Sequence, residues 1–505
     1  MAKRKKRKSV TLILLLLVLA ALISLYFINI NREVKTEDKA GTDSIRLAKL
    51  EDTTKLTSLH YRTKDTEMIL IKDGETWKLE NEPERPINQD KVAGLIRLIS
   101  DISAERIVTE KPDNLADFGL AEPSGYLQGT LADKTTVTLE IGAMEPSKGG
   151  YYAIVNGDGK VYLLATNYGS GFKYTVSSMT VVAEAPDITA DSIYHIAIDN
   201  REGEDFEIIK NKELGPGNDG SDVYAWHILE PYKKGYTAES TKVATLMENY
   251  TGFSYDSCVE YNAGDLSLYG LDNPFSTINL SYTAERTEKL AKPEKDPKTG
   301  KEITEKTYQE PKEYKLSIGN LDDTGNYYIM EAGSKAVYTM AADSVSKMLT
   351  VDPFSVLNPF INIPNINNVD QIDITVDGTA YQVRIEHKTV KDEDGKETIQ
   401  NTYYFNGTKA NEKSFTGLYQ ALVGAKYDTV IKEEVNTKVA PHLTVSYQLN
   451  NPAKTVVGAS FLPYDQSFYL IDTNGEIKFF ADKRRIDDIV KKLVEYDPTK
   501  EPAEE

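Results

Sequence analysis

Few side chains in this sequence have the types and spacing of a catalytic centre. Ser344 and Lys347 fit the Ser-x-x-Lys pattern of penicillin-binding acyl enzymes, and a Lys-Thr-Gly motif begins at Lys298. In those enzymes the serine motif comes first in the chain, whereas here the order is reversed and no Ser-Asp-Asn motif is present. We therefore interpret this match as unrelated to acyl transfer.

The histidines and the single cysteine do not assemble a site either. No two histidines have the His-x-His or His-x-x-x-His spacing that would place two nitrogens on one metal ion. Cys258 aligns with Ile107 and Val430 in the repeat described below, so we expect a buried small apolar residue. The phosphate loop of nucleotide hydrolases and the Gly-x-Ser-x-Gly elbow are absent. We expect no catalytic residues, no metal and no cofactor; the histidines are His60, His195, His227, His387 and His442.

Charge divides the 505 residues into a basic head and an acidic body. The chain has 59 Lys and Arg against 78 Asp and Glu, and six of the basic residues lie in the first eight positions. The rest carries 53 basic against 78 acidic residues, a net charge of −25. Such a body repels phosphate backbones, so we expect no nucleic-acid partner. One cysteine also excludes an intrachain disulfide framework.

An apolar run at residues 12–30 predicts a transmembrane helix. It is 19 residues long and interrupted only by Ser24 and Asn29, and at ~1.5 Å per residue it matches a hydrocarbon core of ~30 Å. Residues 1–11 form a basic head that is expected in the cytoplasm, and residues 31–55 form a polar tether. A cleaved signal peptide is the alternative, although its apolar stretch is usually about 7–15 residues. We thus expect a single-pass protein of the cell membrane whose bulk is extracytoplasmic.

The elements that would position a site follow an internal repeat. An apolar stripe with the helical spacing i, i+3, i+4, i+7 occurs three times, and Asn88 precedes the first as a possible cap. The stripes are Val92, Leu95, Ile96 and Ile99, then Val243, Leu246, Met247 and Tyr250, then Phe415, Leu418, Tyr419 and Leu422.

Flanking motifs recur in the same order around the first two stripes. A strand with Trp77 or Trp226 comes before, and a Gly-Leu-x-x-Pro segment, an Ile-Gly strand end and a tyrosine pair come after. We interpret Gly-Leu-x-x-Pro as a structural motif in which the glycine allows a turn, the leucine is a buried apolar residue and the proline, with its fixed φ, precedes the next strand. An interaction role for the loops and the tyrosines is the alternative. The residues are Gly119, Leu120, Pro123, Tyr151 and Tyr152, and Gly270, Leu271, Pro274, Tyr327 and Tyr328.

Each unit is predicted to be α+β, with one principal amphipathic helix on a mainly antiparallel sheet, because alternating apolar runs are joined by turn dipeptides. The third unit is a degenerate copy that has lost Gly-Leu-x-x-Pro. A charged insertion in the second unit is predicted to be a mobile loop because it cannot bury enough apolar surface. The predicted parts are unit 1 at 56–185, unit 2 at 186–352 with its insertion at about 285–311, a proline-containing connector at 353–368, unit 3 at 369–493 and an acidic tail at 494–505.

The Trp strand, the helix stripe, Gly-Leu-x-x-Pro, the Ile-Gly strand end and the tyrosine pair together resemble the bacterial family known as domain of unknown function 4340. The resemblance covers essentially all of the chain after the apolar run. It implies a membrane-anchored protein that accompanies ABC transporters of the gliding-motility type, and it implies no catalytic residues.

Three functions are open at this point. The first is a non-enzymatic scaffold or accessory protein of an ABC-type transporter. The second is a module that binds a polysaccharide or peptide, for which aromatic stacking from Trp77, Trp226 or the tyrosine pairs would be needed. The third is a cell-wall hydrolase with acidic residues converging in a cleft.

Overall fold

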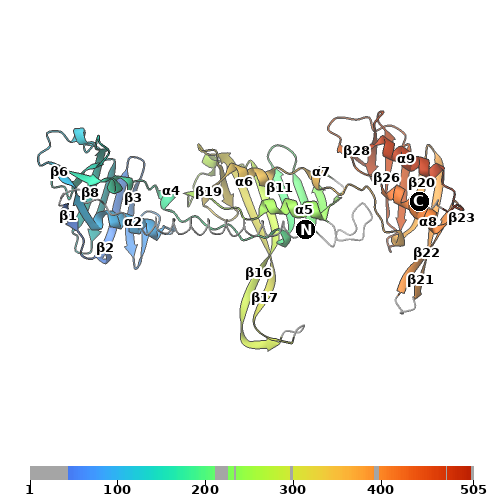
Figure 1. Cartoon of the computed structure of the whole chain (residues 1–505), viewed down its shortest axis with the longest axis horizontal. Helices are drawn as coiled ribbons and strands as arrows, with labels where there is room; N and C mark the ends of the chain where they lie inside the picture. The colour runs from blue at the N-terminus through green and yellow to red at the C-terminus, as the bar shows by residue number, and fades with distance from the viewer. Residues whose placement is uncertain are drawn as a thin grey trace, which may run out of the picture. The chain divides into compact units, whose positions relative to one another are not determined.

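The computed structural model describes residues 44–210, 226–232, 235–295, 300–391, 397–473 and 475–501 (Figure 1). The predicted head at 1–11, the predicted transmembrane helix at 12–30 and residues 31–43 of the predicted tether lie outside the described residues. Among the residues that are described, no helix is both long and apolar enough to cross a membrane. The chain divides into two compact units, and the boundary in the sequence lies between Val181 and Val182.

The first unit contains one eight-stranded antiparallel sheet in the order β4-β3-β2-β7-β8-β9-β10-β6. A short strand, β1 (Ile45–Lys49), pairs separately with β5 (Asp101–Ala104). The other elements are η1 (Thr53–Lys55), β2 (Leu56–Thr63), β3 (Glu67–Asp73), β4 (Thr76–Leu79), α2 (Gln89–Ser100), β6 (Arg106–Thr109), η2 (Leu115–Phe118), β7 (Gly125–Leu131), β8 (Thr136–Met144), β9 (Gly150–Val155), β10 (Val161–Ala165), α3 (Thr166–Ser170) and α4 (Val176–Met179).

Helix α2 covers one face of this sheet, as its stripe predicts. The side chain of Asn88 accepts a hydrogen bond from the N–H of Lys91 and caps the helix. Val92, Leu95 and Ile99 are fully buried. The helix packs closely on β7. A Cβ on Gly129 of β7 would lie only 2.5 Å from Ile99 Cδ1, so this position has no room for a side chain.

The second unit contains two nine-stranded antiparallel sheets, here called repeat 2 and repeat 3. Repeat 2 has the order β14-β13-β12-β11-β16-β17-β18-β19-β15. Its elements are η3 (Ala190–Ser192), β11 (Ile193–Asn200), β12 (Phe206–Lys210), β13 (Trp226–Glu230), β14 (Tyr236–Ala238), α5 (Ser240–Met247), η5 (Glu248–Tyr250), β15 (Ser257–Glu260), η6 (Leu266–Tyr269), β16 (Ser276–Lys295), β17 (Glu302–Leu321), β18 (Tyr327–Glu331), β19 (Val337–Met340), α6 (Ala342–Leu349) and α7 (Pro353–Val356).

Repeat 3 has the order β23-β22-β21-β20-β25-β26-β27-β28-β24. Its elements are η7 (Ile366–Asn368), β20 (Val369–Val376), β21 (Thr379–Lys391), β22 (Glu397–Phe405), β23 (Thr408–Lys409), α8 (Glu412–Val423), β24 (Thr429–Val430), β25 (Leu443–Leu449), β26 (Val456–Pro463), β27 (Phe468–Thr473), β28 (Glu476–Asp482) and α9 (Lys483–Val494).

The three sheets share one topology, so the predicted repeat is present in the fold. Each sheet begins with three antiparallel strands, and a short fourth strand, β14 or β23, follows them in repeats 2 and 3. The striped helix α2, α5 or α8 comes next, and a later strand, β6, β15 or β24, pairs at the far edge of the sheet. The first unit, here called repeat 1, lacks only the short edge strand that β14 and β23 supply. Repeat 3 keeps the order although it has lost Gly-Leu-x-x-Pro. Repeats 2 and 3 each have a helix beyond the one that the stripe predicts: α6 buries Val345 and Met348, and α9 buries Ile486, Ile489 and Leu493.

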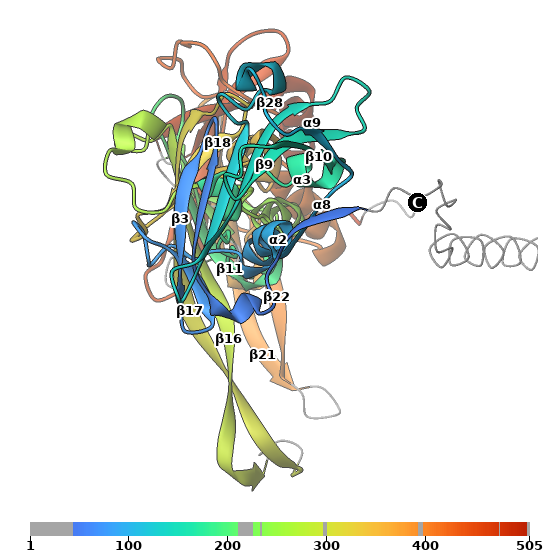
Figure 2. The same cartoon turned by 90° about the vertical axis from the view of Figure 1, so that its left-hand side faces the viewer.

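The prediction of a loop at about 285–311 is wrong for most of the described residues of that segment, because β16 reaches Lys295 and β17 begins at Glu302. β16 and β17 continue past the end of the sheet as a two-stranded antiparallel ribbon (Figures 1 and 2). Cross-strand pairs stabilise it in place of a core. Arg286 contacts Glu310 on the opposite strand and lies 5.2 Å from the ring centre of Tyr308, and the Thr287 and Thr307 hydroxyls are 3.1 Å apart.

Three predicted boundaries also differ from the structure. The tether was expected to reach residue 55, but β1 and η1 already belong to repeat 1. The connector at 353–368 is not a free spacer, because it begins with α7 and buries Leu357 and Ile361. The tail was expected from residue 494, but Tyr496 packs edge-on against Phe405 at 5.0 Å.

One aromatic cluster joins repeats 2 and 3 within the second unit. The ring of Phe479 on β28 lies 5.1 Å from Tyr232 and 5.3 Å from Tyr236, which belong to repeat 2. It also lies 4.7 Å from Tyr427 of repeat 3 and 5.8 Å from Phe354 of the connector. The two repeats therefore share one hydrophobic core.

We predict that Phe479→Ala uncouples the unfolding of repeats 2 and 3. Phe479 is 1% exposed, and removing such a ring costs about 3–5 kcal/mol. Because the lost contacts cross the junction, calorimetry should resolve two transitions for the second unit in place of one. Phe415→Ala, which removes a ring stacked on Tyr403 inside repeat 3, is the matched control. A single transition in the Phe479 variant would contradict the shared core.

Candidate functional site

The two Gly-Leu-x-x-Pro segments have the local structure that the turn interpretation predicts. η2 and η6 each end at a glycine, Gly119 or Gly270, with a left-handed φ of 67°. The next residue, Leu120 or Leu271, is buried. Strands β7 and β16 begin two residues after Pro123 and Pro274 respectively, so each proline precedes a strand.

The Ile-Gly strand ends are explained by these loops. A Cβ on Gly142 would lie 2.3 Å from the carbonyl oxygen of Phe118, and one on Gly319 would lie 2.1 Å from that of Tyr269. Both distances are too short for any real side chain. The glycine on the strand therefore allows the loop to pack directly on the backbone, which is why the two motifs recur together.

The structure brings each loop together with the second tyrosine of its pair. The Tyr152 ring lies edge-on to Phe118 at 5.1 Å, and Tyr328 lies edge-on to Tyr269 at 5.0 Å. Neither tyrosine is exposed enough to present a whole ring to a ligand, since both are half-buried.

The first tyrosine of each pair lies apart from the loop contact. Tyr151 packs over Gly169 of α3, where a Cβ would lie 2.3 Å from its ring. Tyr327 stacks on Phe275 with ring centres 6.3 Å apart. Successive residues of a strand point to opposite faces, so the pair contributes to both sides of its sheet.

A carboxylate anchors the loop of repeat 2. The Tyr269 hydroxyl donates a hydrogen bond of 2.6 Å to Glu260. Burial and this acceptor raise the pKa of Tyr269 to about 12, so the phenol stays protonated at neutral pH. The residues of the Gly-Leu-x-x-Pro segments and of the tyrosine pairs thus make contacts that pack the loops and strands of their own repeat.

Cys258 occupies the place that the repeat assigns to it. It lies on β15 opposite Tyr338, as Ile107 lies opposite Tyr162 and Val430 lies opposite Phe479. Cys258 is 0% exposed. The prediction of a buried small apolar residue is confirmed.

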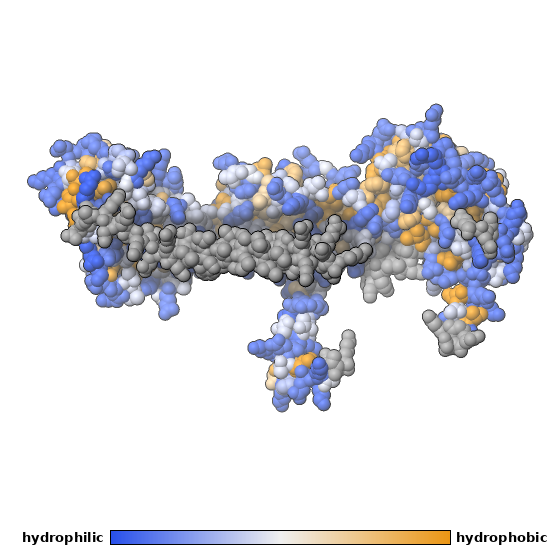
Figure 3. Space-filling view, in the orientation of Figure 1, coloured by the Kyte–Doolittle hydropathy of each residue, from blue (hydrophilic) through white to orange (hydrophobic). Residues whose placement is uncertain are grey.

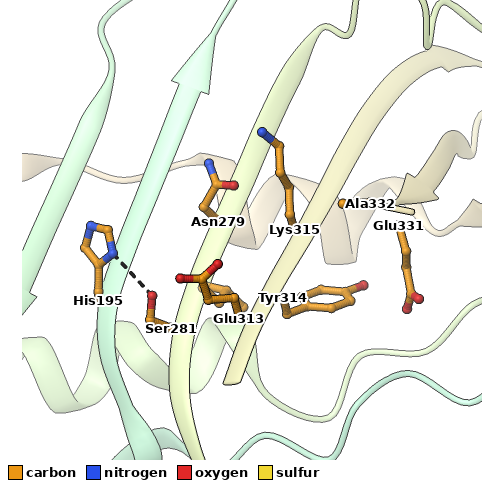
Figure 4. Close-up of a pocket in the computed structure, with 9 residues that line it drawn as sticks. His195, Asn279, Ser281, Glu313, Tyr314, Lys315, Glu331 and Ala332 are labelled. Atoms are coloured by element: carbon orange, nitrogen blue, oxygen red, sulfur yellow. Dashed lines mark hydrogen bonds between the residues drawn. The ribbon is translucent and has the colours of Figure 1, made fainter. Parts of the chain in front are cut away.

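A second candidate, which the sequence patterns did not single out, lies on the outward face of the repeat 2 sheet. His195 Nε2 is 2.9 Å from Glu207 Oε1, and His195 Nδ1 is 3.4 Å from Ser281 Oγ. His195 lies on β11, Glu207 on β12 and Ser281 on β16. A pocket of about 520 Å³ adjoins them (Figure 4), lined by His195, Asn279, Leu280, Ser281, Glu313, Tyr314, Lys315, Glu331 and Ala332.

A serine, a histidine and a glutamate in contact could in principle act as nucleophile, base and orienting acid. However, the 3.4 Å contact between Ser281 and His195 is long for a proton transfer. His195 and Ser281 are also paired residues of the β11–β16 ladder, where their backbone N–H groups bond across the strands and do not form an oxyanion hole. The lining is instead suited to hydrogen bonds with a polar ligand, since Lys315 and Asn279 can donate and Glu313 can accept.

A tyrosine network borders this pocket. The Tyr255 and Tyr314 hydroxyls are 2.7 Å apart, and Tyr255 donates to Glu331. Burial raises the pKa of Tyr255, and the neighbouring Tyr314 and Glu331 raise it further. Both phenols are therefore hydrogen-bonding groups and not bases at neutral pH.

The tryptophans do not contribute to a binding surface. Trp77 and Trp226 occupy equivalent strands, β4 and β13, and each is 7% exposed within its core. They cannot stack on a ligand, so neither tryptophan supports the hypothesis of a ligand-binding module. Within the described part of the chain, no group of three or more His, Cys, Asp or Glu residues is placed to hold a metal ion.

Comparison with known proteins places these motifs in a family. The family model described as "Domain of unknown function (DUF4340)" matches residues 77–274 and 226–452. The two matches begin at Trp77 and Trp226, the equivalent tryptophans of repeats 1 and 2. No curated protein and no solved structure matches the chain.

We predict that Gly319→Ala destabilises the second unit by about 1–3 kcal/mol, because its Cβ would overlap the carbonyl oxygen of Tyr269. Urea unfolding measures the effect. Gly417→Ala in α8 is the control, since no atom lies within 4 Å of that Cβ, and it should stabilise by about 0.5–1 kcal/mol. Equal effects of the two substitutions would contradict the close packing of the loop.

Proposed function

The chain belongs to the DUF4340 family, and from that premise we propose that it is a non-enzymatic, membrane-anchored extracytoplasmic protein serving as an accessory or scaffold component of an ABC-type transport complex. The observation that carries the proposal is the recurrence of one sheet order in three repeats. The motifs that recur between repeats make packing contacts, and repeated units commonly provide binding surfaces.

The proposed placement rests on the first 30 residues. An apolar run of membrane length follows a head with six basic residues, and such heads stay on the cytoplasmic side. The net charge of −25 beyond the head favours a body held away from anionic headgroups. The transporter as partner comes from the family resemblance.

A second candidate function is the binding of a small polar ligand, such as a sugar or a peptide, in the pocket beside His195. Its volume of about 520 Å³ and its mixed donors and acceptors favour this use. Residues 195 and 281 meet across two neighbouring strands, so the pocket is built on rigid elements of the sheet.

We predict that a cysteine on the ribbon reacts with a membrane-impermeant maleimide in intact cells. Thr307 is exposed, whereas the native Cys258 is 0% exposed and gives little background. Thr307→Cys should label equally before and after cell opening, and Ser9→Cys in the basic head should label only afterwards. The reverse pattern would contradict the proposed orientation.

We also predict that the detergent-solubilised full chain co-purifies with an ATP-binding cassette subunit and a permease. The control is a chain in which residues 12–30 are replaced by the span of an unrelated single-pass protein, which tests whether the extracytoplasmic part suffices. Repeated recovery of no transporter subunit by the native chain would count against the scaffold.

A further inference from the structure

Strand β16 has a free edge that its counterparts in the other repeats lack. β7 pairs with β2 over its whole length, from Gly125 to Leu131, and β25 pairs with β20 from Leu443 to Leu449. β16 pairs with β11 only as far as Tyr282 but continues to Lys295. Among the described residues, no strand pairs with β16 on that side beyond Tyr282.

The hydrogen bonds of β17 show in which direction the backbone groups of the ribbon point. The N–H of Ala332 donates to the carbonyl of Lys315, so Lys315 directs its backbone groups toward β18 and away from β16. Because these directions alternate along an antiparallel strand, the odd-numbered residues near the base of β17 face outward. Pro311, which has no N–H, is one of them, and it lies opposite Thr283.

The same alternation applies to β16. Its even-numbered residues bond to β17, so its odd-numbered residues present N–H and C=O groups to the free edge. These groups are open to a further strand. On the opposite edge of the ribbon, Pro311 removes a donor near the base, which favours β16 as the edge that accepts a strand. The residues concerned on β16 are Thr283, Glu285, Thr287 and Lys289.

A groove lies beside this edge. Its volume is about 1060 Å³, and its walls are the loop at 186–192 and the first ribbon residues of β16. The loop leads directly into β11, so a strand laid in the groove would continue the line of β11 beside β16. The lining residues are Pro186, Asp187, Thr189, Asp191, Ser192, Tyr282, Thr283, Ala284, Glu285 and Gln309.

The groove has an acidic lining. Asp187, Asp191 and Glu285 are exposed acidic residues of the lining, and no lysine, arginine or histidine lines it. The surface of the ribbon is largely hydrophilic (Figure 3). An occupant with basic side chains is therefore favoured over an acidic or an apolar one.

We propose that the groove and the free edge of β16 bind an extended segment of a partner protein that carries lysine or arginine and adds to the sheet as a strand. Strand addition obtains affinity from backbone hydrogen bonds and selectivity from side-chain contacts. A two-stranded ribbon is marginal in water, and a third strand would stabilise it. This inference rests on the proposed scaffold function and names the chemistry of its partner.

The test measures binding of a fluorescein-labelled nine-residue peptide of alternating lysine and valine to the full chain in detergent, by anisotropy. Its companion has glutamate in place of lysine and should bind at least tenfold more weakly. Thr287→Pro removes an N–H from the free edge and should weaken binding of the lysine peptide at least tenfold. Thr307→Pro alters the cross-strand partner on the opposite edge and should change binding less than twofold. Asp187→Asn with Asp191→Asn should reduce the preference for lysine.

Hydrogen exchange provides a second readout. The lysine peptide should slow exchange of the segment 283–289 in the native chain and in Thr307→Pro. Circular dichroism of both proline variants verifies the fold. Failure of the lysine peptide to bind, or equal losses in both proline variants, would overturn the proposal.

Two further outcomes are distinguishable. Sedimentation that shows a dimer of the native chain broken by Thr287→Pro would assign the edge to a second copy and overturn the partner segment. A native chain that co-purifies with the transporter but binds no peptide would overturn this inference alone. A chain that binds the peptide on this edge but recovers no transporter would overturn only the proposed function.

Discussion

The whole fold depends on covering one apolar face of each sheet. A 12-residue helix such as α2 or α8 is about 18 Å long and about 10 Å wide, whereas nine strands spaced at about 4.8 Å span about 43 Å. One helix therefore leaves much of the face uncovered. In repeat 1 the segment after β10 completes the cover, with Tyr168 and Met179 in the core. In repeats 2 and 3 the helices after the equivalent strands, α6 and α9, add buried residues to the core. Leu357 and Ile361 of the connector and the cluster around Phe479 belong to the same core, which the two repeats share.

The parts of this arrangement that could be predicted are those with local physical signals. The three stripes predict helices because their spacing is helical over two turns, and Asn88 caps α2 as its residue type suggests. Gly-Leu-x-x-Pro could be interpreted as a turn because glycine, which has no Cβ, adopts a φ of 67° more readily than other residues. Hairpins between neighbours in sequence account for most of the strand order, and repeat 3 keeps that order even after its motifs have diverged. The central pairing of each sheet and the pairing at its far edge join strands that are distant in sequence.

The parts that could not be predicted depend on register. Ser281 lies 86 residues after His195 and Glu207 lies 12 residues after it. The three side chains meet only because β11 pairs with β12 and β16 in one alignment. The composition of the ribbon predicts disorder, whereas the position of Arg286 opposite Tyr308 and near Glu310 stabilises paired strands. The short strand β1 has no local signal that separates it from the tether, because its partner, β5, lies more than 50 residues later.

Differences between copies of one unit indicate where function has been added. Positions that all three repeats retain are explained by packing, as the equivalence of Cys258, Ile107 and Val430 illustrates. The extension of β16 and β17 has no packing explanation, since most of its side chains are exposed. A ribbon outside the core adds backbone groups that water must satisfy and little apolar burial to offset their ordering. Its persistence as paired strands therefore favours a role outside the fold, and the free edge beside the acidic groove is the part of the ribbon with the geometry for such a role.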